Sequence, residues 1–358
     1  MAHLSSRQHI SPDSGFPVTL HPAYNPKIRN YVPPEPIRQP AAVGKDRAAF
    51  ADPKKKALFA VATPKDRTES IGTVLEGVQL SSLNGQQLDE LALLVNERGV
   101  VFFRDQDLTT GKQVELFQHF GKLDKHPAQK DVKHVIIKGS TEDHREILSY
   151  TPWPSGDFHA DTSFEINPPS YSMLRMEEHP PVGGDTAWTT QLSTCGEAIP
   201  NRPPIDTHHP AVRTHPVTGL KALNVNPGFV TGFAELKRKE SGTSSVRRFQ
   251  GHVDKLTSPT DKLLEFLEYH IHSADDHAVR WKWEVGSIAM WDNRCSLHRV
   301  IPGTYKGARR GIRTTVFGEK REYPKDFVNN MLTKLQRTSM SIARAVRKGR
   351  RDLKAVRS

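Results

Sequence analysis

The order of elements along the middle of the chain constrains its fold more than any other feature, because helical patterns come first and strand patterns follow. Apolar residues between positions 88 and 95 recur at the spacing of an amphipathic helix, and Gly99 is placed to end it. Thr109 or Thr110 can cap a second helix. Short apolar or alternating stretches, separated by glycine and proline turns, predict strands at residues 100–103, 171–176, 186–189, 285–291 and 314–318. With one helical insertion at residues 263–271, this order favours an α+β domain around an antiparallel sheet or barrel.

The two ends of the chain differ in composition from this middle. Nine of the 26 prolines lie in the first 53 residues, which favours extended chain over a packed core. The last 24 residues carry eight Lys or Arg and one Asp, and so account for seven of the eleven net positive charges. A partial apolar stripe indicates that part of this segment is helical. We therefore expect a Pro-rich N-terminal extension at residues 1–68, one large domain at 69–322 and a basic, partly helical tail at 323–358.

The composition argues against several classes of protein. No run of about 18 apolar residues occurs, so no membrane span is expected, and the first residues lack the apolar stretch of a secretory signal. The two cysteines, Cys195 and Cys295, exclude a disulfide scaffold and favour a reducing compartment, so we expect a cytoplasmic protein. Because the charge excess lies in the tail, no nucleic-acid partner is expected. The oligomeric state stays open, and a homo-oligomer is compatible with the sequence.

A short polar motif in the strand region carries the first sign of chemistry. The sequence GDFHADTSF places His159 and Asp161 two residues apart, so in an extended strand both side chains point to the same face. Buried together, the pair costs stability unless it is satisfied by a mutual hydrogen bond or by a bound ion. The motif alone favours an imidazole–carboxylate pair in a core, or a solvated loop, over a metal site.

A third candidate ligand lies far downstream, in the sequence WDNRCSLHR. His298 stands near the end of a predicted strand, 137 residues after Asp161 (298 − 161), and neighbours in a sheet can be that distant in sequence. Two histidines and one carboxylate on one side of an octahedral metal leave three positions open, an arrangement suited to non-haem iron(II) that activates oxygen. His159, Asp161 and His298 are therefore the candidate metal ligands.

Two arginines follow His298 at short range. Arg309 is 11 residues after His298 (309 − 298), and Arg313 is four residues further on. On one strand, an even separation directs both side chains to the same face. Arginine offers a planar fork of donors to a carboxylate or sulfonate. A metal site with two inward arginines predicts that two anions bind beside the metal.

Together these motifs resemble the taurine/2,4-D (TauD/TfdA) dioxygenases, iron(II)- and 2-oxoglutarate-dependent enzymes that include fungal-like sulfonate and taurine dioxygenases. The likeness runs from residue 71 to 318 and rests on the signatures GVVFFRDQ, HADTSF, PPVGGDTAW and WDNRCSLHR followed by RRGIR. It implies a double-stranded β-helix (jelly roll) core with surrounding helices, iron(II) as the metal, and 2-oxoglutarate and O2 as cosubstrates. The reaction it implies is hydroxylation of a small anionic substrate with release of succinate and CO2.

The resemblance also implies roles for single residues. It makes His159, Asp161 and His298 the iron ligands. It makes Arg309, helped by the Thr186 hydroxyl, the partner of the distal carboxylate of 2-oxoglutarate. The residues expected to contact the primary substrate are Arg313, which holds its anionic end, His126 and the aromatic Phe164.

The substrate pocket departs from the family's pattern for taurine. Three residues after the pocket histidine, where taurine enzymes have a tyrosine, this chain has Gln129. Four residues before the first iron ligand, where they have an asparagine, it has Ser155. The resemblance therefore implies intact iron and cosubstrate sites beside an altered pocket. The expected substrate is a sulfonate such as taurine, or a carboxylate such as an amino acid.

Two other classes of function are compatible with parts of the pattern. A zinc-dependent hydrolase can use two histidines and one aspartate, but it leaves Arg309 and Arg313 without a role. A non-catalytic binding protein on the same fold would be expected to lose a metal ligand, and all three ligands are present. The dioxygenase is the prediction that gives a role to the ligands and to both arginines.

Overall fold

The computed structural model describes residues 42–124, 158–190, 207–225, 230, 233, 262–301 and 309–319, and the backbone of residues 259–261, β1 (His9–Ile10), β2 (Pro17–Val18) and β6 (Val135–Gly139). The predicted tail at 323–358 lies outside the described residues. So do the predicted pocket residue His126 and the two departures from the taurine pattern, Gln129 and Ser155. Within the described ranges, no helix combines the length and the apolar character that a membrane span requires.

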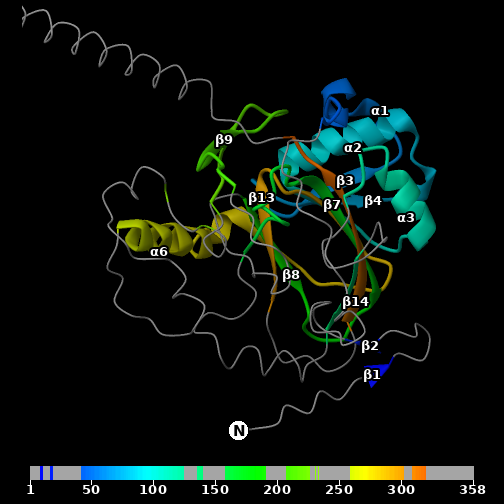
Figure 1. The fold of residues 1–358 in the computed structure, drawn as a ribbon. Coiled ribbons are helices and arrows are strands. Elements are labelled where there is room, and N and C mark those ends of the chain that lie inside the picture. The colour runs from blue at the N-terminus through cyan, green and yellow to red at the C-terminus, as the bar shows by residue number, and fades with distance from the viewer. Residues whose placement is uncertain are drawn as a thin grey trace, which may run out of the picture.

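A seven-stranded sheet forms the centre of the molecule (Figure 1). Its order is β3, β4, β5, β12, β7, β14 and β6, and every neighbouring pair is antiparallel except β4 with β5. Strands far apart in sequence are therefore neighbours in space, with β12 inserted between β5 and β7. The bounds of its other strands are β3 (Thr63–Asp66), β4 (Thr73–Glu76), β5 (Val100–Phe103), β7 (Pro169–Glu178), β12 (Ile288–Asp292) and β14 (Arg309–Phe317).

A second, smaller sheet has three antiparallel strands in the order β11, β8, β13. Its central strand is β8, and β13 lies at one edge. A separate hairpin is formed by β9 and β10. The bounds of these strands are β8 (Thr186–Thr190), β9 (Val212–Thr214), β10 (Lys221–Leu223), β11 (Ala278–Trp281) and β13 (Ser296–Val300).

Helices lie outside both sheets (Figure 1). In the described part of the chain they are α1 (Lys56–Phe59), α2 (Gly85–Arg98), α3 (Thr110–Phe117) and α6 (Pro259–His272), with short 3₁₀ turns at Arg47–Phe50, Leu80–Ser82 and Asp275–His277. α2 begins with a capping box, in which Asn84 and Gln87 each bond the other's backbone N–H. Thr109 caps α3 by accepting a hydrogen bond from the backbone N–H of Lys112.

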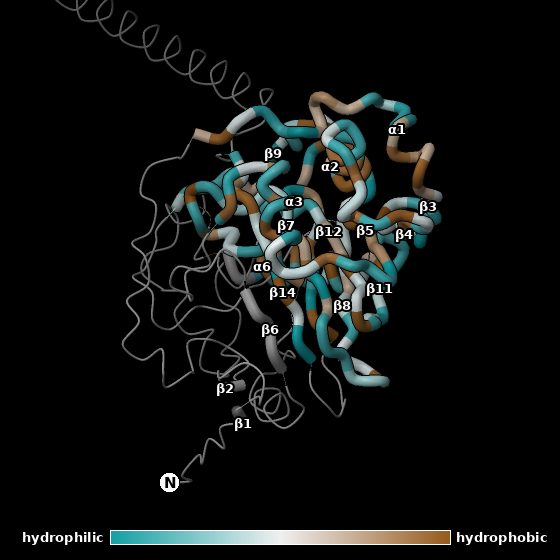
Figure 2. Tube along the Cα trace, turned by 90° about the vertical axis from the view of Figure 1, so that its right-hand side faces the viewer, coloured by the Kyte–Doolittle hydropathy of each residue, from teal (hydrophilic) through white to brown (hydrophobic). Residues whose placement is uncertain are grey.

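The alternation of side chains along the central strands buries both faces of the large sheet. On β5, Val101 and Phe103 pack against α1, α2 and α3, whereas Val100 and Phe102 pack towards the small sheet. Phe102 stacks on Trp281 of β11 with ring centroids 4.3 Å apart. Apolar segments accordingly run through the middle of the molecule around β5 and β12 (Figure 2). Since each such buried side chain contributes about 1.5–3 kcal/mol, this packing holds the two sheets face to face.

Most of the predicted elements are confirmed, and their combination is a mixture of helices with mainly antiparallel sheets. The strand predicted at residues 285–291 begins only at Ile288. The reason is a tight turn at Gly286, which has a φ of +80° and whose N–H donates to the Met176 carbonyl. β14 begins earlier than predicted, at Arg309, so it includes both candidate arginines.

Part of the segment predicted as an N-terminal extension packs into the molecule. Ala48, Leu58 and Ala62 belong to the core between the helices and the large sheet, and β3 is an edge strand of that sheet. The division of the chain at residue 68 stays a prediction, but the described residues just before it contribute to the same core as the domain.

Candidate metal centre and active site

Backbone pairing brings the two predicted histidine ligands together. His159 and His298 form an isolated antiparallel bridge, in which each N–H donates to the other's carbonyl oxygen at 2.9 Å. Their ring centroids are 4.3 Å apart. Because β13 is the edge strand of the small sheet, the segment around His159 can extend that sheet by this one pair. The long separation in sequence is therefore closed by a β-bridge.

The Asp161 carboxylate turns towards the same point, as the alternation predicted. Its Oδ1 is 3.7 Å from His298 Nε2, and its Oδ2 accepts a hydrogen bond of 2.7 Å from the Ser172 hydroxyl on β7. Ligand atoms of His159, Asp161 and His298 lie within 4.8 Å of one another. Thr162 follows with a φ of +35°, a left-handed conformation that ends the extended segment directly after the carboxylate.

The electrostatics of the site favour a charged carboxylate beside a neutral imidazole. Burial raises the pKa of the Asp161 carboxyl, but Arg313 and the two histidines outweigh burial and the pKa falls to about 2. Burial, followed by the neighbouring His159, lowers the pKa of His298 well below its ordinary value. Metals are bound by deprotonated carboxylates and neutral imidazoles. Two imidazoles and one carboxylate on one side of the site fit iron(II) with three coordination positions open.

A cavity of about 180 Å³ opens beside these ligands. It is lined by His159, Leu174, Thr186, Trp188, Trp291, His298, Val300, Arg309 and Arg313. Aromatic and aliphatic side chains thus form much of the wall, while the two arginines supply positive charge. The cavity connects both histidine ligands to both arginines that the sequence singled out.

Arg309 and Thr186 are hydrogen-bonded to each other in the wall of the cavity. Arg309 donates from Nε to the Gly184 carbonyl at 2.8 Å and from Nη2 to Thr186 Oγ1 at 3.1 Å. Trp283 Nε1 also donates to Thr186 Oγ1, at 2.9 Å. Because that oxygen already accepts two hydrogen bonds, the Thr186 hydroxyl directs its own proton to another acceptor. Gly184 has a φ of +70°, and a Cβ there would lie 3.3 Å from Arg309 Cδ, so this close approach requires glycine.

Arg313 lies in the same cavity but against the metal ligands. Its Nη1 pairs with Asp161 Oδ1, and its Nε is buried without a hydrogen-bond partner among the described residues. Arg310, between the two cavity arginines, instead pairs with Glu177 at 3.3 Å and Glu178 at 2.6 Å. Arg309 and Arg313 therefore line the same cavity, as predicted, although the register of β14 against β7 shifts between Arg310 and Gly311.

The predicted pocket aromatic, Phe164, is half-buried in the turn after Asp161. Its carbonyl oxygen accepts a hydrogen bond of 2.6 Å from the Thr207 hydroxyl. Phe164 is absent from the set of described residues that line the cavity. Contact of Phe164 with a substrate stays a prediction, as does that of His126.

The residues that support the candidate ligands were not predicted from the sequence, above all Ser172, Asn293 and Trp283. Each of the three is at most 1% exposed and is hydrogen-bonded to a candidate ligand or cosubstrate residue. Signals for two of them were present. Ser172 is a polar residue inside a buried strand, and Asn293 directly follows Trp291 and Asp292 in the motif that leads to His298.

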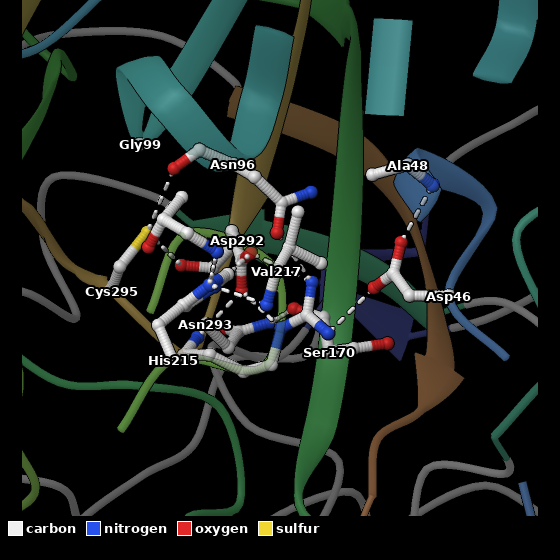
Figure 3. A network of polar contacts seen from close by, with 12 residues as sticks. Asp46, Ala48, Asn96, Gly99, Ser170, His215, Val217, Asp292, Asn293 and Cys295 are labelled. Carbon is white, nitrogen blue, oxygen red and sulfur yellow. Dashed lines mark hydrogen bonds and ion pairs between the residues drawn. The ribbon is translucent and has the colours of Figure 1, made fainter. Parts of the chain in front are cut away.

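A buried charge network holds the turn between β12 and β13 (Figure 3). Asp292 accepts hydrogen bonds from Arg294 Nη2 at 2.8 Å and from His215 Nε2 at 3.0 Å. Arg294 also reaches Asp46, ahead of the first described helix, at 2.7 Å. Burial raises the pKa of Asp292, but Arg294 and His215 outweigh it and hold the pKa well below its usual range. The carboxylate is therefore charged at neutral pH.

His215, Asp292 and Cys295 also have ligand atoms within 4.8 Å of one another, yet their bonding argues against a second metal centre. His215 Nδ1 accepts hydrogen bonds from the backbone N–H groups of Val217 and Thr218 at 3.3 and 3.2 Å. Nε2 therefore carries the proton and donates it to Asp292. Burial raises the pKa of the Cys295 thiol well above its ordinary value, which keeps it protonated.

Comparison with known proteins places this geometry in a family. The model of the family described as "Taurine catabolism dioxygenase TauD, TfdA family" matches residues 63–193 and 189–315. Alpha-ketoglutarate-dependent dioxygenase cnsM of Penicillium expansum is 31% identical over 335 residues, covering 80% of this chain and 88% of that protein. The alpha-ketoglutarate-dependent sulfonate dioxygenase of Saccharomyces cerevisiae is 30% identical over 274 residues, covering 66% of this chain and 62% of that protein.

A solved structure agrees with these relatives. The crystal structure of a taurine dioxygenase from Burkholderia xenovorans is 28% identical to this chain and has a TM-score of 0.57. The match covers 74% of this chain and 93% of that protein. The residues that match the family model contain the three candidate ligands and both cavity arginines. The chain therefore belongs to the TauD/TfdA family and is a 2-oxoglutarate-dependent non-haem iron dioxygenase.

Proposed function

We propose that this enzyme hydroxylates a small anionic substrate and converts 2-oxoglutarate to succinate and CO2. The observation that carries the proposal is that His159, His298, Arg309 and Arg313 border one cavity, with the Asp161 carboxylate beside it. A zinc-dependent hydrolase on these ligands would leave both arginines without a task. A binding protein would have no need for three converging metal ligands.

The metal would be held by His159, Asp161 and His298, whose donor atoms converge within 4.8 Å. Iron(II), when bound, would supply with O2 and 2-oxoglutarate the oxidising power that turns a C–H bond of the substrate into an alcohol. One oxygen atom of O2 enters the product and the other enters succinate, and 2-oxoglutarate loses its carboxyl group as CO2. The chain's own part is to hold the reactants together and to keep water out. Trp188 and Trp291, at 0% and 1% exposure, form apolar wall beside the ligands.

The distal carboxylate of 2-oxoglutarate would bind Arg309 and Thr186. Arg309 is 3% exposed, so its charge in the wall of the cavity favours an anion there. The Thr186 hydroxyl, whose oxygen already accepts from Arg309 and Trp283, adds a donor for the same carboxylate. A planar guanidinium beside a hydroxyl suits a carboxylate group better than a neutral ligand.

The anionic group of the primary substrate would bind Arg313. The buried Nε of Arg313 has no hydrogen-bond partner among the described residues, and its Nη1 lies beside the metal-binding carboxylate. An anion held there keeps a carbon a few bonds away next to the metal, which is how an indiscriminate oxidant becomes selective. We infer a sulfonate, or a carboxylate such as an amino acid. A sulfonate hydroxylated at its first carbon would collapse to an aldehyde and sulfite.

We further infer that the seven-stranded and three-stranded sheets are the two faces of a jelly roll. Two features support this. Trp188 of β8 and Trp281 of β11 share a core with the inner face of the large sheet, and neighbours such as β5 and β12 are distant in sequence, as antiparallel double-sheet folds require.

The proposal is tested with the iron-loaded full-length chain and a panel of sulfonates, amino acids and other small acids. Succinate that forms in proportion to an oxidised product is expected for at least one of these acids. The Asp161→Ala variant serves as the matched blank. Anaerobic addition of 2-oxoglutarate to the iron-loaded protein should also produce a visible charge-transfer band. Zinc-dependent hydrolysis without consumption of 2-oxoglutarate would overturn the proposal.

A further inference from the structure

The two oxygen atoms of the Asp161 carboxylate lie in different surroundings. Oδ1 faces His298 Nε2 at 3.7 Å and pairs with Arg313. Oδ2 accepts a hydrogen bond of 2.7 Å from the hydroxyl of Ser172 on β7. Ser172 is 0% exposed and Asp161 is 4% exposed, so water cannot readily replace this bond.

Asn293 determines the direction of the Ser172 hydrogen bond. Its Oδ1 accepts from Trp291 Nε1 at 3.0 Å and from the backbone N–H of Asp161 at 3.2 Å. Both of these groups can only donate, so the orientation of the Asn293 amide is set by its neighbours. Its Nδ2 therefore faces Ser172 and donates to the hydroxyl oxygen at 2.8 Å. The Ser172 proton is left to point at Asp161 Oδ2.

The turn that carries Asn293 is itself held firmly. The backbone N–H of Asn293 donates to the Ser170 carbonyl at 2.8 Å, and Figure 3 shows Asn293 between Ser170 and the charge network around Asp292. Asp292 accepts hydrogen bonds from both Arg294 and His215. The Asn293 amide therefore has a stable position from which to hold Ser172.

We propose that Ser172 and Asn293 are positioning residues: they hold Asp161 Oδ2 in a hydrogen bond and so present Oδ1, which faces His298 and also pairs with Arg313, as the oxygen that would bind the metal. This inference rests on the metal site proposed above. A carboxylate that bound through both oxygens would occupy two coordination positions and leave two of six open beside the histidines. Bound through Oδ1 alone, Asp161 leaves three open, which a chelating 2-oxo acid and a further reactant both require.

The test measures metal binding by the full-length protein, with Mn(II) as a calorimetric probe. Ser172→Ala should raise the dissociation constant for Mn(II) about ten- to hundredfold, the usual effect of losing a hydrogen-bonding partner of a metal ligand. Ser172→Cys, which keeps the side-chain volume but donates only a weak hydrogen bond, should raise it by a similar factor. The matched control is Ser170→Ala. Ser170 lies on the same strand, is 5% exposed, and donates a hydrogen bond of 3.3 Å from its hydroxyl to the Phe317 carbonyl. Its replacement should leave Mn(II) binding unchanged.

A double-mutant cycle tests whether Asn293 acts through Ser172. Asn293→Ala should weaken Mn(II) binding in the native background and have a much smaller effect when combined with Ser172→Ala. The visible spectrum of the Co(II)-loaded protein should change in Ser172→Ala but not in Ser170→Ala, because only the former alters the carboxylate's binding. Thermal unfolding of the metal-free variants checks that each one folds.

The outcomes separate this inference from the proposed function. Mn(II) affinities of Ser172→Ala and Ser172→Cys within about twofold of Ser170→Ala would overturn the inference and leave the metal site standing. A loss in Ser172→Ala that Ser172→Cys restores would show a packing role and also overturn it. If the unaltered chain binds no Mn(II), or Asp161→Ala binds it equally well, the metal site itself fails.

Discussion

Replacement of Arg309 by alanine is the sharpest test of how the enzyme holds 2-oxoglutarate. The residue is 3% exposed and its guanidinium is aligned by the Gly184 carbonyl and the Thr186 hydroxyl. Removing a charged hydrogen-bonding partner costs about 1.5–3 kcal/mol, and more when the remaining charge stays buried. Since about 1.4 kcal/mol corresponds to a factor of ten, the apparent affinity for 2-oxoglutarate should fall about ten- to 150-fold or more.

The assay follows succinate formation while 2-oxoglutarate is varied at a saturating concentration of the primary substrate. Arg310→Ala is the matched control, because this neighbour on β14 pairs with Glu177 and Glu178 and does not line the cavity. The control should keep the native KM for 2-oxoglutarate. The KM of Arg309→Lys for 2-oxoglutarate should lie between those of Arg310→Ala and Arg309→Ala, since lysine keeps the charge but loses the planar fork of donors. An unchanged KM for 2-oxoglutarate in Arg309→Ala, with weaker binding of the primary substrate, would show that the roles of Arg309 and Arg313 are exchanged.

Three further predictions concern the metal, the primary substrate and the buried charge network. Asp161→Ala should abolish Mn(II) binding and turnover, and native activity in this variant would remove Asp161 from the metal site. Arg313→Ala should weaken binding of the primary substrate and let succinate form without a matching amount of product, while the affinity for 2-oxoglutarate stays nearly unchanged. The yield of product per succinate measures this coupling, and a preferred substrate without an anionic group would contradict the role of Arg313. Asp292→Asn leaves the buried charge of Arg294 without its main partner and should lower the free energy of unfolding at pH 7 by about 3–5 kcal/mol in urea titrations. Because the pKa of Asp292 is lower in the folded state than in the unfolded chain, its contribution is fully present above about pH 4. The stability gap between native and variant protein should therefore begin to narrow near about pH 4 and keep narrowing as the pH falls towards the depressed pKa of the folded state. A gap independent of pH would refute the assignment.

The local elements and the candidate chemistry could be read from short-range patterns. The spacing of apolar residues from Leu88 to Val95 predicts α2, and the run at residues 100–103 predicts β5, because periodicity reports which face of an element is buried. The two-residue spacing of His159 and Asp161 predicts that their side chains converge, and the four-residue spacing of Arg309 and Arg313 predicts that both enter one cavity. Each of these relations depends only on the geometry of a single strand or helix.

Contacts between distant segments were decided only by the tertiary structure. The register of β13 against the segment of His159 places the second histidine beside the first, and the pairing of β7 with β12 places Ser172 next to Asn293. Strand periodicity says which face a side chain occupies, but a sheet partner and its register follow from the packing of the whole core. For the same reason, the sequence could nominate candidate metal ligands, whereas only the folded chain shows which oxygen of Asp161 lies beside His298.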